Sequence, residues 1–403
     1  MKVVKPSYEI YEKPEANDRM GVLKFIEKIG RTCYKSEDKI TDESCVKFVN
    51  MLRKNMHLAM LEHYIFTLRI TNSMMHDINE AIDLIRREDP VNKLYKDTDN
   101  EPDEFDQFAD QRFSEVLNHF KITPYYFTTT NKIDGDQQLV QSDAYYLISF
   151  SATTLLYLAK YYNKYERDNV FNYICEYMST KIPELFLTDE FVPTAPDEFD
   201  ISNESRIHIM SNKELQEQPA DIRAVHDMIT VKFVTDRGVT HEIVRHRPFS
   251  YAQESTRYCN YHKEDYEFGI NVITPINILI TRATELTNLG LEYQHGEERA
   301  WYNAMYECEK AYNEMVGLGV KPQTARSVLP TCLKTEIIMT GRMVDFIHFF
   351  RMRADKAAHP DLRLLAVPFL NECIEKYPEI YKLLQHRVEE NKEWIDHYER
   401  FCE

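Results

Sequence analysis

The sequence predicts an α+β protein in which helices dominate, and three features support that prediction. Residues 61–70 and 229–234 have the β-branched and aromatic composition, with partial alternation, that is typical of strands. Residues 292–317 and 342–387 are long stretches of helical composition. The chain has 403 residues, 43% of them hydrophobic, so it can bury a substantial core as one large domain or two ordinary ones.

In chain order, the first 60 residues are predicted to be largely helical, because apolar residues recur at helical spacing. LEHYIFTLRI (61–70) then changes to strand composition. SDAYYLISFSATTLLYLAKYY (142–162) is expected to be a strand that runs into a buried helix, and VFNYICEYMSTKIPELF (170–186) continues as helix. Two acidic stretches, 97–110 and 189–200, are expected to be solvated loops.

The region from about residue 72 to 226 is interpreted as an insertion. One feature suggests an internal duplication: YYLISFSATTLLYLAKYY (145–162) and EIIMTGRMVDFIHFFRMR (336–353) both read as a strand that leads into a helix. The alternative is that any aromatic strand–helix unit would look similar, and the sequence leaves both interpretations open.

Composition narrows the functional classes. The formal net charge of −17 argues against binding of a nucleic acid polymer, which requires an extended basic surface. No apolar run approaches the roughly 20 residues needed to cross a bilayer, and the N-terminus lacks a signal-peptide pattern, so we expect no membrane association and a cytoplasmic location. The eight cysteines form no CxxC pair, which favours free thiols in a reducing compartment. Neither GxGxxG nor GxxxxGK[ST] occurs.

RHRPFSYAQESTRY (245–258) concentrates cationic and hydroxyl side chains in an acidic chain. It follows a predicted strand, ITVKFV, and a predicted helix, GVTHEIV, which we expect Pro248 to end just beyond the RHR. Arginines at a helix C-terminus can simply stabilise the helix dipole. However, Gln253, Ser255 and Arg257 alternate with their neighbours, so they can project to one side of an extended segment and form a cradle for phosphate and a pyrimidine edge.

Metal and thiol chemistry are not favoured. In HEIVRH (241–246) the two histidines are five residues apart, whereas the zinc motif HExxH needs a spacing of four to place both on one helix face. Cys259 and His262 form a lone CxxH pair without a partner pair at suitable spacing. We therefore expect no metal site and no nucleophilic cysteine.

RHRPFSYAQESTRY resembles the signature of the flavin-dependent thymidylate synthases, an RHR followed after seven residues by a serine, with arginine and tyrosine close behind. Ser255 stands at the position of that serine. HLAMLEHYIFTLRI (57–70) and GRTCYKS (30–36) resemble N-terminal segments of the family, QTARSVLP (323–330) resembles a nucleotide-binding segment, and IIMTGRMVDFIHFFRMRAD (337–355) resembles the family's strand and following helix.

The matching elements keep the family order over about 1–71 and 227–385. The resemblance therefore implies a flavin-dependent thymidylate synthase fold, with a central mixed sheet flanked by long helices. Residues 1–71 and 227–403 would be its two parts, and 72–226 would be a large, mainly helical insertion with acidic loops.

The resemblance also implies roles for individual residues. The FAD-binding positions correspond to His57, Arg245, His246, Arg247 and His348. The dUMP-binding positions correspond to Glu242, Gln253, Ser255, Arg257, Arg326 and Arg353, of which Ser255, Arg257 and Arg353 would also be catalytic. The sequence departs from the family at Ala59, where relatives have serine or threonine, and at Arg342 and Val344, where many have asparagine and arginine.

The activity implied is conversion of dUMP to dTMP. Methylenetetrahydrofolate would supply the carbon, and hydride would come from FAD that NADPH has reduced, because side chains provide neither. The arginines would stabilise negative charge that develops on the uracil oxygens. Ser255 lacks a convincing adjacent base in sequence, so we expect no covalent enzyme nucleophile. The family resemblance further implies a homotetramer with active sites shared between subunits.

Three alternatives stay open. The chain could be a degenerate relative that binds a nucleotide without turnover and serves as a binding or interaction protein, with Ala59 and Val344 as the supporting departures. The RHR region could instead be a small RNA-binding patch, or the scaffold could host a different flavoenzyme. The sequence assigns no role to the insertion.

Overall fold

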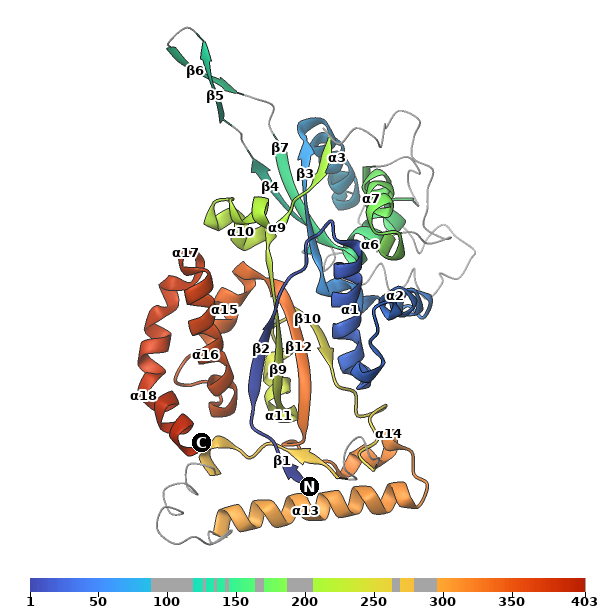
Figure 1. Ribbon diagram of the computed structural model, residues 1–403, viewed down its shortest axis with the longest axis vertical. Coiled ribbons are helices and arrows are strands. Elements are labelled where there is room, and N and C mark those ends of the chain that lie inside the picture. Colours follow the sequence, from blue (N-terminus) through green and yellow to red (C-terminus); the bar gives the residue numbers. More distant parts are fainter. Residues whose placement is uncertain are drawn as a thin grey trace. The chain divides into compact units, whose positions relative to one another are not determined.

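The computed structural model describes residues 1–87, 119–125, 128–133, 136–141, 145–163, 170–186, 206–262, 269–278 and 296–402. It is a mixed α and β structure with antiparallel sheet pairings, which confirms the predicted fold class (Figure 1). No helix within these ranges has the length and apolar character needed to span a membrane. The two acidic stretches predicted as loops, 97–110 and 189–200, lie outside the described residues.

Two compact units make up the chain. Unit 1 comprises Met1–Lys13, Lys28–Ile40 and Ile229–Glu403, and unit 2 comprises Pro14–Glu27 and Thr41–Met228. Residues 14–27 and 41–71 therefore group with the interpreted insertion, whereas the sequence assigned them to the N-terminal part of the synthase fold. The junction at Met228 falls close to the expected boundary after residue 226.

Unit 1 is built on a four-stranded sheet with the order β10-β12-β9-β2. The strands are β2 (Ser7–Tyr11), β9 (Met228–Asp236), β10 (Ser250–Gln253) and β12 (Lys334–Arg342). β2 pairs antiparallel with β9 and β10 pairs antiparallel with β12. Because side chains alternate along a strand, the sheet has two chemically different faces, an aromatic face and a charged face.

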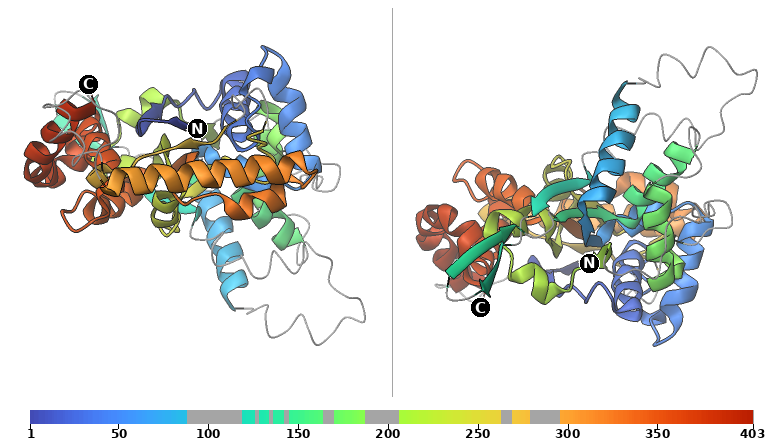
Figure 2. Two further views of the ribbon diagram at one scale, coloured as in Figure 1. Left: turned by 90° about the horizontal axis from the view of Figure 1, so that it is seen from below. Right: turned by 90° about the horizontal axis from the view of Figure 1, so that it is seen from above.

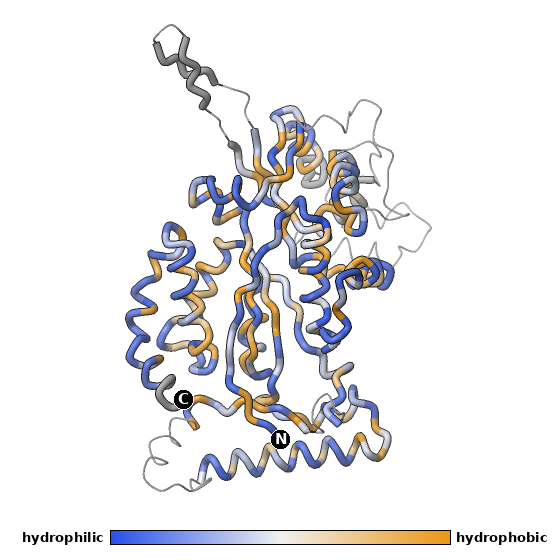
Figure 3. Tube along the Cα trace, viewed as in Figure 1, coloured by the Kyte–Doolittle hydropathy of each residue, from blue (hydrophilic) through white to orange (hydrophobic). Residues whose placement is uncertain are grey.

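The aromatic face of the unit 1 sheet is covered by helices. α15 (Met343–Arg353) and α16 (Pro360–Lys376) pack there, followed by α17 (Pro378–Tyr381), η5 (Lys382–Leu384) and α18 (Gln385–Cys402). The ring of Phe233 on β9 lies 5.8 Å from Phe369 and 6.4 Å from Phe349. Figure 3 shows the contrast between α16, which is rich in hydrophobic residues, and the mostly hydrophilic α18. This aromatic packing anchors the end of α15.

The remaining elements of unit 1 form a smaller cluster. β1 (Lys2–Val3) pairs in parallel with β11 (Asn271–Val272), and α13 (Gly296–Gly317) is one uninterrupted helix (Figure 2). Tyr312 of α13 is fully buried against Tyr261, with ring centroids 5.6 Å apart. After α13 come α14 (Pro322–Ala325) and η4 (Arg326–Val328), which complete this cluster and place Arg326.

Unit 2 has its own four-stranded sheet, in the order β4-β7-β3-β8, and a separate hairpin, β5-β6. The strands are β3 (Ile65–Thr71), β4 (Lys121–Tyr125), β5 (Thr128–Ile133), β6 (Asp136–Gln141), β7 (Tyr145–Ser151) and β8 (Ile207–Ile209). Its helical elements are α2 (Ser44–Lys54), η2 (Leu58–His63), α3 (Asn72–Arg87), α6 (Ala152–Asn163), α7 (Val170–Lys181), α8 (Pro183–Phe186), α9 (Asn212–Gln216) and α10 (Ala220–His226). α1 (Arg19–Tyr34) contributes residues to both units.

The two units share a topological frame. In each, two neighbouring strands pass directly into a helix: β9 into α11 (Arg237–Ile243) and β12 into α15 in unit 1, and β3 into α3 and β7 into α6 in unit 2. A further strand, β10 or β4, lies between these two in sequence and pairs antiparallel with the second. The similarity noted between residues 145–162 and 336–353 thus corresponds to equivalent strand–helix units, β7-α6 and β12-α15.

The sequence predictions failed at identifiable places. α1 and α2 confirm that the first 60 residues are largely helical, but the short strands β1 and β2 were not predicted there. The region interpreted as an insertion contains several helices, and of its strands β4 to β8 only β7 was predicted. The predicted helix before the RHR was wrong at its end, because α11 ends at Ile243 and not at Pro248. The hydroxyl of Tyr251 lies 2.8 Å from the carbonyl oxygen of Ile243, within hydrogen-bond reach of a group that a longer helix would have paired.

Candidate active site

The RHR segment forms a turn that follows a short, well-capped helix. α11 begins where β9 ends, and the carboxylate of Asp236 accepts a hydrogen bond of 2.8 Å from the backbone N–H of Val239. After α11 the chain turns, with Arg245 and Arg247 exposed and His246 buried. The turn therefore directs two guanidinium groups to solvent and one imidazole into the protein.

Arg353, the last residue of α15, joins this turn to the helix before it. Its Nε donates to Nε2 of His246 over 2.9 Å, its Nη1 donates to Oε2 of Glu242 over 2.8 Å, and its Nη2 donates to the Glu242 carbonyl oxygen over 2.9 Å. The guanidinium fork thus binds a side chain and a main chain at once, a geometry that lysine cannot reproduce.

Arg353 also sets the ionisation of its partners. The hydrogen bond from Arg353 lowers the pKa of Glu242, so that carboxylate is charged at neutral pH. Burial, followed by the positive charge of Arg353 and the nearby His348, lowers the pKa of His246 to about 4. His246 is therefore neutral, and because its Nε2 accepts from Arg353, its proton resides on Nδ1.

His348 and Arg245 flank this cluster. The ring of His348, an exposed residue of α15, lies 5.8 Å from the ring of His246. Arg245 lies 3.8 Å from Glu242 and its side chain is 72% exposed, so this ion pair is weak and leaves the guanidinium accessible.

Strand β10 connects the RHR turn to residues 254–257, which we call the serine turn because they contain Ser255. Tyr251 lies within hydrogen-bond distance of the carbonyl oxygens of Ile243 (2.8 Å) and His246 (2.7 Å), and burial raises the pKa of its hydroxyl, so it stays a donor. Nε2 of Gln253 donates to the hydroxyls of Thr240 on α11 (3.1 Å) and Thr335 on β12 (3.3 Å). Gln253 is therefore held beside α11 at Thr240, two residues before Glu242.

The segment after β10 brings the predicted nucleotide-binding residues together. Ala252, Glu254 and Thr256 are buried, whereas Gln253 and Ser255 are half-buried and Arg257 is exposed, so the expected alternation is confirmed. The hydroxyl oxygen of Ser255 accepts a 3.3 Å hydrogen bond from the backbone N–H of Arg257. Nη1 of Arg326, an exposed residue, donates to the Thr256 hydroxyl over 3.3 Å.

Two further residues singled out from the sequence are His57 and Arg342. His57 is an exposed residue of unit 2 that precedes η2, so the structure does not place it with the RHR turn, and its role stays a prediction. Arg342, which stands where many relatives have asparagine, is 3% exposed, and its burial lowers its pKa to about 10. Arg342 therefore does not present its guanidinium at the surface of α15.

Sequence reasoning missed the residues that hold the site in place. Tyr251, Thr240 and Thr335 orient the turns through single hydroxyl groups, and Glu254 is a buried carboxylate inside the serine turn. Alternation along β10 could have indicated Tyr251, since it shares a face with Gln253. No sequence signal indicated the two threonines, because their role depends on the register of separate elements.

The RHR turn, the serine turn and Arg353 all lie within a segment that matches a known family. Residues 223–379 match the family described as thymidylate synthase complementing protein. Flavin-dependent thymidylate synthases of Geobacter sulfurreducens and Pyrococcus furiosus are 31% and 33% identical over 36% and 35% of this chain, and over 56% and 51% of their own lengths. That of Synechocystis is 27% identical over 39% of this chain and 71% of its own length.

Among solved structures, a UMP/dUMP methylase from Streptomyces cacaoi bound with 5-Br dUMP has a TM-score of 0.32 and 21% identity, over 40% of this chain and 74% of that chain. The chain spans about half the length of the first curated relatives it matches. Residues 223–379 are therefore similar to the flavin-dependent thymidylate synthases.

Proposed function

We propose that the chain is a flavin-dependent thymidylate synthase that converts dUMP to dTMP. Methylenetetrahydrofolate would be the one-carbon donor, and FAD with NADPH would supply the reducing equivalents. The observation that supports this most directly is the cluster in which Arg353 joins Glu242 and His246, within the segment that matches the family.

The nucleotide-binding part of the proposal rests on available donors. Arg257 and Arg326 are exposed and flank one turn, so their guanidinium groups can bind a phosphate together. Arg353 has five N–H bonds, and its hydrogen bonds within the described part of the chain use three of them. Its remaining two can donate to an oxygen of the uracil and stabilise negative charge there.

The residues also fit a flavin dinucleotide. Arg245 and Arg247 are exposed and lie on a turn beside His348, which suits an anionic pyrophosphate next to a ring system. Bound FAD would supply the hydride. The protein would hold that cofactor through the two arginines, while neutral His246 would keep Arg353 oriented towards the nucleotide.

No covalent enzyme nucleophile is needed in this proposal. The Ser255 hydroxyl accepts from a backbone N–H, and its expected task is to bind the nucleotide. Cys259 is 3% exposed, which suits packing in the core better than attack on a substrate. A homotetramer with shared active sites remains part of the proposal, and His57 would then belong to the flavin site.

The deciding experiment is tritium release from C5-labelled dUMP by purified protein with methylenetetrahydrofolate, NADPH and FAD, each omitted in turn. Release that requires both FAD and NADPH is the expected result. No release from folded protein that still binds dUMP and FAD would overturn the synthase proposal and favour a nucleotide-binding protein without turnover. The exposed Val344 on α15 would then be the first position to change to arginine.

A further inference from the structure

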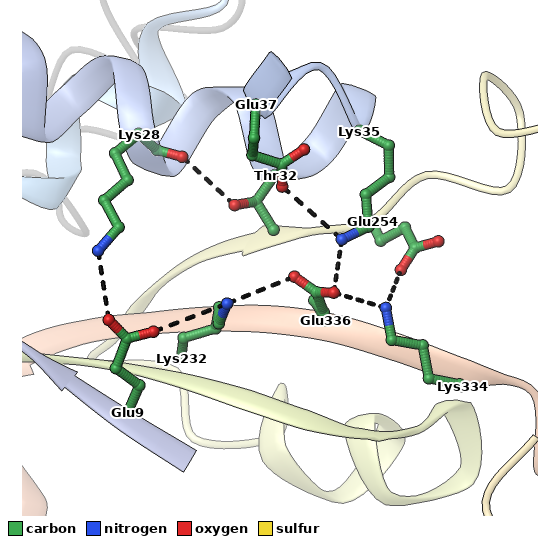
Figure 4. Close-up of polar contacts among 9 residues, drawn as sticks. All are labelled: Glu9, Lys28, Thr32, Lys35, Glu37, Lys232, Glu254, Lys334 and Glu336. Atoms are coloured by element: carbon green, nitrogen blue, oxygen red, sulfur yellow. Dashed lines mark hydrogen bonds and ion pairs between the residues drawn. The ribbon is translucent and has the colours of Figure 1, made fainter. Parts of the chain in front are cut away.

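The charged face of the unit 1 sheet bears a network of lysines and glutamates, which we call the charged network (Figure 4). Glu9 and Lys232 lie opposite each other on β2 and β9, and Lys334 and Glu336 alternate along β12. α1 and the segment after it add further members from above the sheet (Figure 4). The members are Glu9, Lys28, Lys35, Glu37, Lys232, Glu254, Lys334 and Glu336.

The charged network is balanced, which argues against a ligand site there. Lys28 and Lys232 contact Glu9 at 3.3 and 3.7 Å, and Lys232 also lies 3.7 Å from Glu336. Lys35 and Lys334 each lie 2.5 Å from Glu336. Every ammonium group in the network has a carboxylate partner, so no member offers an unbalanced charge to a bound ion.

Burial increases along the charged network. At its outer end, the side chains of Lys28 and Glu9 are 47% and 51% exposed, so that ion pair contributes little to the stability of the fold. At its inner end, Lys334 and Glu254 are 13% and 1% exposed, with Nζ and Oε2 3.3 Å apart. Burial alone would raise the pKa of Glu336, but Lys334 and Lys35 lower it to about 2. Loss of one partner at this end leaves a buried charge uncompensated.

The inner end holds one residue of the serine turn at three points. Glu254 lies between Gln253 and Ser255. Its backbone N–H donates to the Glu336 carbonyl oxygen over 2.9 Å, its own carbonyl oxygen accepts from Nη2 of Arg237 over 2.8 Å, and its carboxylate pairs with Lys334. The position of Glu254 therefore fixes the backbone from which Ser255 and Arg257 project.

The end of α1 is tied to the same turn. The backbone N–H of Ser255 donates to the carbonyl oxygen of Cys33 over 3.1 Å. Two residues later, Lys35 has a φ of +46°, a left-handed conformation that costs a non-glycine residue about 1 kcal/mol. The ion pairs of Lys35 with Glu336 and Glu37 help to hold this backbone in place.

We infer that Glu254, with Lys334 and Glu336, is a positioning unit that sets the serine turn for nucleotide binding without touching the nucleotide. The inference rests on the proposed function for the identity of the ligand, dUMP. It adds buried residues from the opposite face of the sheet to a site otherwise formed by surface arginines and hydroxyls. Its members act through the backbone of residues 254–257.

The test compares two isosteric changes in the full chain, Glu254→Gln at the inner end and Glu9→Gln at the outer end as matched control. We expect Glu254→Gln to weaken dUMP binding, measured by calorimetry, about tenfold and to leave FAD binding within about twofold. It should also speed amide hydrogen exchange in peptides that cover residues 253–259. Glu9→Gln should change none of these, because its carboxylate is solvated and lies away from the turn.

The possible results separate failure of the positioning role from failure of dUMP as the proposed ligand. Unchanged exchange in the turn of Glu254→Gln, or an equal change in Glu9→Gln, would overturn the positioning role whether or not dUMP binds. Faster exchange confined to Glu254→Gln, in a protein whose wild type fails to bind dUMP, would support positioning and remove the proposed ligand. If Glu254→Gln does not fold, Glu254→Asp keeps the charge and retracts the carboxylate, and the same two readouts apply.

Discussion

Units 1 and 2 share a strand–helix frame but differ in where the helix after the first strand ends. In unit 1, α11 is 7 residues long, and the chain then turns to expose Arg245 and Arg247. In unit 2, α3 follows the equivalent strand and continues for 16 residues. The shared topology therefore does not account for the arginines that we propose bind anions. Their exposure follows from the early end of α11, whose last residue, Ile243, has its carbonyl oxygen 2.8 Å from the Tyr251 hydroxyl of β10.

The polar interiors of the two units also differ. In unit 2, the fully buried His226 lies 2.8 Å from the Ser149 hydroxyl and 2.7 Å from the Thr123 hydroxyl, so both ring nitrogens have partners. In unit 1, His246 has the Arg353 guanidinium as its partner, and two N–H bonds of that guanidinium have no partner among the described residues. His226 thus bonds only within the interior of unit 2, whereas His246 holds an arginine of the candidate site in unit 1.

The largest expected effect on activity comes from replacing Arg353, which bonds both Glu242 and His246. Arg353→Ala should lower kcat/KM for dUMP by about 10²–10³, because it removes preorganised donors and leaves Glu242 with only the weak ion pair to Arg245. The matched control is Arg19→Ala, which removes the guanidinium that pairs with Glu184 in unit 2. Steady-state kinetics should show wild-type values for the control, and an equal loss in both variants would contradict the contrast between units.

A smaller effect is expected from removing one hydroxyl in each unit. Tyr251→Phe removes the hydroxyl that reaches the carbonyl oxygens of Ile243 and His246. It should lower the free energy of unfolding by about 1–2 kcal/mol and weaken FAD binding severalfold. Thr123→Val in unit 2 leaves Nε2 of His226 without that partner and should cost about 1–3 kcal/mol. Denaturant titration and flavin fluorescence measure both quantities, and reduced FAD affinity in Thr123→Val would break the comparison.

The smallest effect concerns pH. The pKa of His246 is about 4 in the folded state and about 6.5 in the unfolded state, so the unfolded state binds more protons between these values. The free energy of unfolding should therefore fall as pH decreases from 6.5 to 4, and His246→Asn should reduce that slope. Melting temperatures across this range test it, and an unchanged slope in the variant would show that His246 is not the group responsible.

Local patterns in the sequence predicted the elements that supply the site, and tertiary contacts determined the rest. β9, α11, β12 and α15 were predicted from local composition and partial alternation. The end of α11 did not follow, since the Tyr251 hydroxyl that reaches Ile243 comes from a separate strand. The strand β2 was missed because SYEIY carries a glutamate, whose partner Lys232 lies on another strand.

The same distinction between local patterns and tertiary contacts explains which residues of the candidate site could be predicted from the sequence. The RHR and serine turns were found because their residues are adjacent in sequence, and the role of Arg353 came from family resemblance. The positioning of Glu254 by Lys334 was not predictable, because 80 residues separate them and only the pairing of β10 with β12 brings them together.

The hydrogen bond from Arg353 to His246 joins residues 107 positions apart in the chain. During synthesis, the whole RHR signature is made long before α15 exists to complete the cluster. A transcript interrupted between the two would yield a polypeptide that still matches the signature but lacks the guanidinium that orients it. A sequence search for proteins with the proposed activity should therefore require Arg353 as well as the RHR signature. The signature alone indicates resemblance to the family and not a complete cluster.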